Sequence, residues 1–126
     1  MSLKVDIITP YGRIFNDSVD ALSLPGVDGE FGVLEGHSEL LAMLKAGVIE
    51  ITRKNQRELI AINWGYAKVQ SEQVAVLVDG AVLISGNQSQ IAQAIESSKK
   101  LLEEATSDRI AISSVVARIE NATKGR

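Results

Sequence analysis

The sequence has no cysteine, a single histidine and only two prolines in 126 residues. The lack of cysteine excludes disulfides, thiolate metal sites and cysteine nucleophiles, and it favours a reducing compartment. His37 alone cannot supply the three or four protein ligands of a zinc site. No apolar run approaches the roughly 18 residues of a membrane span, and the first ten residues lack the apolar core of a signal peptide. We therefore expect neither a span nor secretion.

An excess of basic side chains is also missing. The net charge is −3, whereas nucleic-acid binding needs clustered lysine and arginine to neutralise phosphates. We therefore expect no nucleic-acid partner. The charge is unevenly placed: residues 1–84 carry 7 basic and 11 acidic side chains, and residues 85–126 carry 6 and 5. This change of sign accompanies a change in the sequence pattern.

The first two-thirds of the chain has the pattern of β-structure. Leu3, Val5 and Ile7 alternate with less apolar neighbours up to Pro10, and residues 14–24 form a second extended run. Many short strands closed by turn residues favour a sandwich or a flattened barrel. Residues 38–44 also fit a helical turn. Further strands are predicted at residues 40–44, 48–53, 58–63, 66–70, 74–79 and 81–84.

Beyond Gly86 there is no glycine or proline until Gly125, and apolar residues recur at helical spacing. Asn87 and Gln90 have the spacing of a capping box, which predicts a helix start. Ser107 or Asp108 offers a cap for a second helix. Two helices joined by so short a loop lie antiparallel as a hairpin. Its apolar stripe is rich in alanine and serine, so we expect weak packing.

The glycine-dense segment 25–32 is a poor candidate for a phosphate site. It lacks a Gly-Lys-Ser/Thr ending, no helix follows it, and Asp28 and Glu30 would repel phosphate. An exposed, mobile turn is the plainer interpretation, and functional surfaces often lie on such loops. Phe31 within it is either an exposed protein contact or an anchor to the core.

His37 and Ser38 do not predict a catalytic pair, because adjacent residues of an extended segment point to opposite faces. The default for His37 is a partly buried ring bonded to backbone, and a subunit contact competes with it. We predict no catalytic residue. The basic side chains of the hairpin form either a solvated face or a surface for an acidic partner. They are Lys99, Lys100, Arg109, Arg118, Lys124 and Arg126.

A function is suggested only by a motif. Residues 29–41 read GEFGVLEGHSELL, which closely resembles the signature of ATP synthase epsilon subunits, roughly Gly-Glu-x-Gly-aliphatic-x-x-Gly-His-x-x-Leu-Leu. The resemblance continues through LKAGVI at 44–49, GYAKV at 65–69 and VAVLVD at 74–79, and it covers nearly all of residues 3–84. The sequence is thus similar to the epsilon family of rotary F-type ATP synthases.

The resemblance implies an all-β sandwich of about ten strands in residues 1–85 and a regulatory helical hairpin in residues 86–126. It implies a non-catalytic subunit of the central stalk, which couples rotation of gamma and the c ring to ATP synthesis and restrains ATP hydrolysis when the hairpin extends toward the alpha/beta head. Such a subunit is peripheral, on the cytoplasmic face of the bacterial inner membrane, and touches the membrane only through the complex.

The resemblance also assigns residues to contacts. It places the c-ring contact at Gly29, Glu30, Phe31 and Gly32. It places the gamma contact at Thr9, His37, Ser38 and Leu41. The cations expected to take part in inhibition are Lys99, Lys100, Arg109 and Arg118.

Two departures from the family pattern stand out. Glu35 and Glu39 replace prolines found in many relatives, which predicts a less rigid loop. Residues 87–94 read NQSQIAQA where some relatives carry an ATP-binding Ile-Asp-x-x-Arg-Ala motif, so both the Asp and the Arg are missing. We therefore expect no cofactor, and in particular no ATP on the hairpin. The rival hypothesis is a free-standing β-domain that binds a small ligand, or an enzyme of unknown type. It predicts a concave pocket with convergent polar groups, whereas the stalk hypothesis predicts a flat apolar flank.

Overall fold

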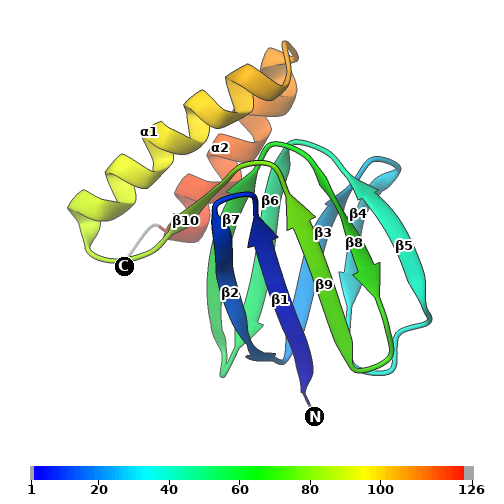
Figure 1. Cartoon of the computed structure of the whole chain (residues 1–126). Coiled ribbons are helices and arrows are strands. Elements are labelled where there is room, and N and C mark those ends of the chain that lie inside the picture. The colour runs from blue at the N-terminus through cyan, green and yellow to red at the C-terminus, as the bar shows by residue number, and fades with distance from the viewer. Residues whose placement is uncertain (1, 124–126) are drawn as a thin grey trace.

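A computed structural model describes residues 2–123, and Lys124 and Arg126 lie outside the described residues. Within that part of the chain, ten strands precede two helices (Figure 1). The predicted fold class, a β-sandwich followed by a helical hairpin, is confirmed. The strands are β1 Leu3–Thr9, β2 Gly12–Val19, β3 Ala21–Gly26, β4 Gly29–Val33, β5 Leu40–Leu44, β6 Gly47–Arg53, β7 Gln56–Ile62, β8 Gly65–Val69, β9 Gln73–Val78 and β10 Ala81–Ile84; the helices are α1 Gln88–Ala105 and α2 Arg109–Thr123.

The strands form one curled sheet that folds into two layers. Its order is β10-β7-β6-β3-β5-β8-β9-β1-β2, with β4 paired to β3. One layer holds β10, β7, β6, β3 and β4, and the other holds β5, β8, β9, β1 and β2 (Figure 1). Among the described residues, neighbouring strands pair antiparallel except β1 with β9, which run parallel. The layers join at the pairing of Gly26 with Leu44.

The core lies between these layers and follows the predicted alternation. Every second residue of β1 points inward, and Leu3, Val5 and Ile7 are fully buried. Ile49 and Ile51 of β6 meet them from the other layer in the same cluster. Large aliphatic side chains fill this space, so most of the apolar burial of the molecule is here.

Two predictions about the sheet need correction. Residues 14–24 do not form one strand, because the chain turns at the exposed Asp20 and passes from β2 into β3. The predicted exposed turn is present but is confined to Val27 and Asp28; the rest of the glycine-dense segment is paired in the hairpin of β3 and β4. Gly26 has no room for a side chain, since a Cβ there would lie 2.7 Å from the Gly29 carbonyl oxygen. The segment 40–44 is a strand rather than a helical turn.

The helices begin where the side chains supply caps. Asn87 and Gln90 form the predicted capping box at the start of α1. Of the two candidates for the second cap, Asp108 is the one used: its Oδ1 accepts hydrogen bonds from the backbone N–H groups of Ile110 and Ala111 at 3.0 and 3.1 Å. Both predicted helix starts therefore have a physical cause in the structure.

The hairpin lies on the outer face of the layer that contains β6, β7 and β10 (Figure 1). A second apolar cluster forms there, separate from the core between the layers. Its members are Val48, Leu59, Ala61 and Ile84 from the sheet, and Ile91, Ala94 and Ile119 from the helices. Among residues 2–123, neither helix has the length and apolar character needed to cross a membrane.

Candidate functional site: an apolar sheet face and an acidic hairpin tip

The outer face of β5, β8 and β9 carries apolar side chains where a solvated sheet would carry polar ones. Strand pairing brings Met43, Tyr66, Leu77 and Ile8 into one row across four strands. Met43 is 57% exposed and Tyr66 is 42% exposed. A row of apolar side chains left in water is typical of a surface that another protein covers. This flat apolar flank is the feature that the stalk hypothesis predicts.

A shallow hollow of about 270 Å³ continues this face at one end of the strands. Trp64 lines it, beside Thr9, Pro10, Tyr66 and Asp79. The Thr9 hydroxyl donates to the Gly12 carbonyl at 3.1 Å, and Asp79 Oδ2 accepts from the Asn63 amide at 3.1 Å. The polar side chains of the hollow thus already have partners within the chain, and its free surface is mainly apolar.

The four predicted gamma contacts are not one cluster. Leu41 lies within the apolar face on β5 and is 70% exposed. Thr9 lies at the far end of β1, level with the end of β9, whereas His37 and Ser38 precede β5 at the opposite end of the strands. The structure therefore brings Leu41 together with Met43 and leaves the other three at the two ends of the face.

His37 has the geometry of the default interpretation. Its ring is half-buried, and Nδ1 lies 2.7 Å from the carbonyl oxygen of Ser38, to which it must donate. The surrounding loop is tied down at both sides: Gly36 N–H donates to the Ser71 carbonyl at 2.7 Å, and Ser2 N–H donates to Glu35 Oε2 at 3.2 Å. Glu35 thus links the loop to the N-terminal segment.

The four predicted c-ring contacts lie together on β4, at the tip of the β3–β4 hairpin. Gly29, Glu30 and Gly32 are exposed. Phe31 instead packs against the core between the layers, so the anchor alternative is the one the structure shows. Among these four residues, Glu30 is left as the exposed charged group, beside the exposed Asp28 of the turn. A hollow of about 470 Å³ lies between the tip and β5, and Val27 and Met43 are among the residues that line it.

Arg118 of α2 reaches this tip. Its Nη1 donates to Glu30 on β4, and its Nη2 donates to Glu50 on β6 at 2.7 Å. Glu50 also accepts from Arg57 at 2.9 Å. Burial disfavours the charged guanidinium of Arg118, but the hydrogen bonds to Glu50 and Glu30 outweigh it and raise its pKa above the ordinary value. One predicted inhibitory cation is therefore bonded to one predicted c-ring contact.

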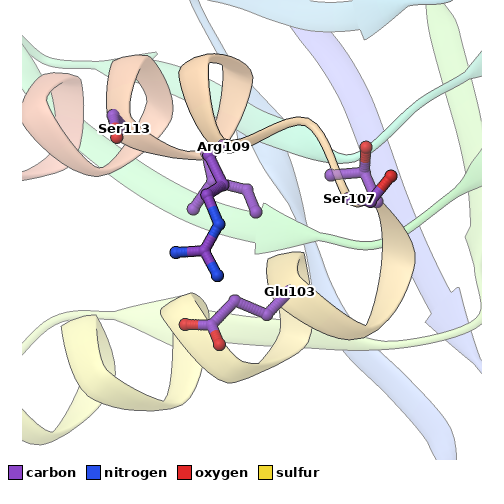
Figure 2. Close-up of a pocket in the computed structure, with 6 residues that line it drawn as sticks. Glu103, Ser107, Arg109 and Ser113 are labelled. Carbon is purple, nitrogen blue, oxygen red and sulfur yellow. The ribbon is translucent and has the colours of Figure 1, made fainter.

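The other predicted cations lie on the hairpin without such a bridge to the sheet. Lys99 pairs with Glu96 of its own helix at 3.3 Å. Arg109 lines a hollow of about 330 Å³ between the helix ends, and its side chain points toward Glu103 (Figure 2). Lys100 is exposed on α1. These three cations are spread over the hairpin, as the sequence pattern indicated, and they do not converge on one site.

Sequence reasoning missed the main features of this surface. The sequence pattern does not single out four exposed apolar residues of this face, which are Met43, Trp64, Tyr66 and Leu77. The available signal was that most outward positions of β5, β8 and β9 hold apolar residues, with Lys68 and Gln73 as the exceptions. Within residues 2–123, no three metal-binding side chains come together, and the absence of catalytic residues and cofactors stays a prediction.

Comparisons with known proteins place the chain in a family. Residues 2–84 match the family model of the ATP synthase delta/epsilon chain, beta-sandwich domain. The chain is 53% identical over 119 residues to the ATP synthase epsilon chain of Helicobacter pylori strain ATCC 700392 / 26695, which spans 94% of this chain and 97% of that one. It is 52% identical over 124 residues to that of Wolinella succinogenes, covering 97% and 95%.

Solved structures show the same fold at lower identity. A chain of the Euglena gracilis mitochondrial ATP synthase, in a structure of OSCP/F1/c-ring, has a TM-score of 0.63 at 22% identity and covers 96% of this chain and 74% of its own. A chain of the Tetrahymena thermophila central stalk/c-ring has a TM-score of 0.57 at 14% identity, covering 85% and 98%. The family match and the Helicobacter and Wolinella relatives establish that the chain belongs to the ATP synthase delta/epsilon chain family.

Proposed function

We propose that the chain is a non-catalytic subunit of the central stalk of an ATP synthase, and that its sandwich docks on gamma through the apolar face of β5, β8 and β9. The observation that carries this proposal is the row formed by Met43, Tyr66 and Leu77, which lies in water in the isolated chain. A stable docking contact buries about 1,200 Å² or more in total. An apolar row that crosses four strands suits such a contact.

The small-ligand alternative is less well supported. A ligand pocket combines an apolar lining with a few polar groups that converge on the ligand. In the hollow beside Trp64, Thr9 and Asp79 are occupied by bonds to their own chain. What is left is a shallow apolar surface that orients no ligand. The stalk function therefore fits the site better.

Docking is tested by polar substitution within the row. In the full chain, Met43→Ser combined with Tyr66→Ser is expected to weaken binding to purified gamma by about 2–4 kcal/mol, since aromatic anchors dominate interfaces. Leu83→Ser is the matched control, because Leu83 is 45% exposed but lies on β10 in the other layer. Calorimetry measures both. Equal loss from the double variant and the control would exclude this face as the gamma site.

The tip of the β3–β4 hairpin is proposed to contact the c ring. Glu30 is exposed there, and Phe31 behind it is anchored to the core, so the tip presents its charge on a supported strand. A cysteine in the variant Glu30→Cys is expected to cross-link to cysteines in the polar loop of the c subunits of the assembled synthase. Cross-links to alpha or beta alone would contradict this placement.

The hairpin is proposed to restrain ATP hydrolysis when it leaves the sandwich and extends toward the alpha/beta head. Lys99, Lys100, Arg109 and Arg118 are the cations it brings, and partly desolvated pairs with acidic loops would exceed the 0–1 kcal/mol or so of surface pairs. In the packed state Arg118 is already bonded to Glu30 and Glu50. Extension therefore has to break those bonds first.

The proposed location follows from the complex. As a subunit of a bacterial synthase, the chain would be held at the cytoplasmic face of the inner membrane by gamma and the c ring. The proposed docking face presents aromatic and aliphatic side chains on a β-sheet, which suits contact with another protein. Release of the chain from washed membranes together with the other stalk subunits, rather than by itself, is the expected behaviour.

A further inference from the structure

Arg118 is the charged group through which α2 reaches two separate strands of the sandwich. Its two acceptors lie 68 and 88 positions earlier in the sequence, on β6 and β4. The neighbouring Ile119 is fully buried in the cluster between helices and sheet. The guanidinium thus lies at the edge of the apolar contact between α2 and the sandwich, where it is only partly solvated.

We propose that Arg118 is a latch that holds α2 on the sandwich, and that the charge at the tip residue Glu30 sets the strength of this latch. A cationic surface that approaches Glu30 would compete with Arg118 for the carboxylate and loosen α2. The competing partner rests on the proposed function, whereas the latch is a property of the isolated chain.

The chemistry of the pair supports a latch rather than an incidental surface contact. A guanidinium presents several N–H donors in a fixed plane, so one arginine serves two carboxylates at once, which a lysine does less well. Glu50 is mostly buried and belongs to the face that α2 covers. The helix itself buries few residues, namely Val116 and Ile119. Val115 and Ala122 are partly buried against the same cluster, so the bridge adds a charged contact at the edge of a small apolar one.

Glu30 makes the latch sensitive to the surroundings of the tip. About half of its side chain is exposed, on the same strand as the exposed Gly29 and Gly32. Arg118 bonds through Oε2 of Glu30, so the other carboxylate oxygen, Oε1, is not part of the bridge. Any free energy that a bound cation takes from the Glu30–Arg118 pair is lost from the docking of α2, and the coupling is reciprocal.

The first test measures amide hydrogen exchange in the isolated full-length chain. Arg118→Gln is expected to speed exchange in residues 109–123 about fivefold, the factor that corresponds to roughly 1 kcal/mol. Arg109→Gln is the matched control, because it removes the same charge from the same helix but outside the bridge. Unchanged exchange in β1 and β9 shows that the sandwich is intact. Equal effects of the two substitutions would overturn the latch.

The second test places a cation at the tip. Glu30→Lys is expected to speed exchange in α2 more than Glu30→Gln does, because a lysine both removes the acceptor and repels Arg118. In the Arg118→Gln background, Glu30→Lys should add nothing. An undiminished effect of Glu30→Lys in that background would overturn the coupling. Neither experiment contains gamma or a c ring, so failure here leaves the docking proposal standing, and failed docking leaves the latch standing.

Discussion

The sandwich and the hairpin are held by different kinds of contact. The sandwich encloses large aliphatic side chains from both layers, such as Leu24, Ile51 and Ile60, all almost completely buried. The hairpin buries small residues as well, including Ala94 and Ser98, whose hydroxyl donates to the Ala94 carbonyl at 2.7 Å. Because small side chains carry little apolar surface, packing of the hairpin removes less apolar surface from water than folding of the sandwich does. It is therefore the part that can move while the rest stays folded.

Movement of the hairpin would expose the second apolar cluster but not the core between the layers. The core between the layers is separate from the cluster under the helices, so departure of the hairpin leaves that core closed. It does uncover Val48, Leu59, Ala61 and Ile84 on the outer face. Exposing an apolar sheet face of this kind to water costs free energy. An extended hairpin therefore needs new contacts that offset this exposure.

The largest loss of stability is expected from a cavity in the sandwich. Ile51→Ala is expected to lower the free energy of unfolding of the whole chain by about 2–5 kcal/mol, because a fully buried side chain leaves a void. Urea titration followed by circular dichroism measures it. Ile110→Ala is the control, since Ile110 is 81% exposed on α2. If the two variants lose similar stability, the sandwich is not the dominant folding unit.

Removal of the hairpin tests whether its mobility has a function. In the assembled synthase, deletion of residues 87–126 is expected to leave ATP synthesis in place and to raise ATP hydrolysis about fivefold or more, the low end of usual coupling energies. Deletion of residues 124–126 alone is the control. Unchanged hydrolysis with a lower melting temperature of the subunit would show that the hairpin only stabilises the sandwich.

A smaller effect is expected from the cap of α1. Asn87→Ala removes the acceptor of the Gln90 N–H bond, which is 2.9 Å long, and is expected to cost the hairpin about 1 kcal/mol. Hydrogen exchange should rise in α1 and not in β1. Gln88→Ala, at the adjacent exposed position, is the control. A matching rise throughout the sandwich would mean that helices and sheet unfold together.

The smallest expected signal is that of ATP. Isothermal calorimetry of the full chain with ATP and magnesium should show no binding heat. The hollow between the helix ends places Glu103 in front of Arg109 (Figure 2), and a carboxylate there opposes a triphosphate. A micromolar affinity would show that the hairpin has a nucleotide-stabilised state and would make its mobility ligand-dependent.

Most elements could be predicted from the sequence because their causes are local. The alternation of Leu3, Val5 and Ile7 and the capping box of Asn87 each need only a few consecutive residues. Residues 14–24 failed because Val19 and Leu22 point inward on both sides of Asp20, so the apolar pattern runs through a turn. Apolar alternation indicates which residues are buried, and residues on both sides of a turn in a sandwich can be buried, so the alternation does not mark the turn.

The contact surface was harder to predict because it depends on which strands become neighbours. The row of Met43, Tyr66 and Leu77 exists only through the register of three strands. The bridge between Arg118 and Glu30 joins residues 88 positions apart. The motif in residues 29–41 indicated the family, but it does not contain the geometry that links the tip to the second helix.

The parallel pairing of β1 with β9 has a consequence for synthesis on the ribosome. The hairpin of β1 and β2 is made first, yet a two-stranded hairpin alone is marginally stable in water. Its other neighbour, Gln73–Val78, is about seventy residues later, and such distant pairing is slow to form. We expect the nascent chain to remain open until β9 emerges and then to close in one step. The helices, whose mutual contacts are local, are translated last and dock on a finished surface.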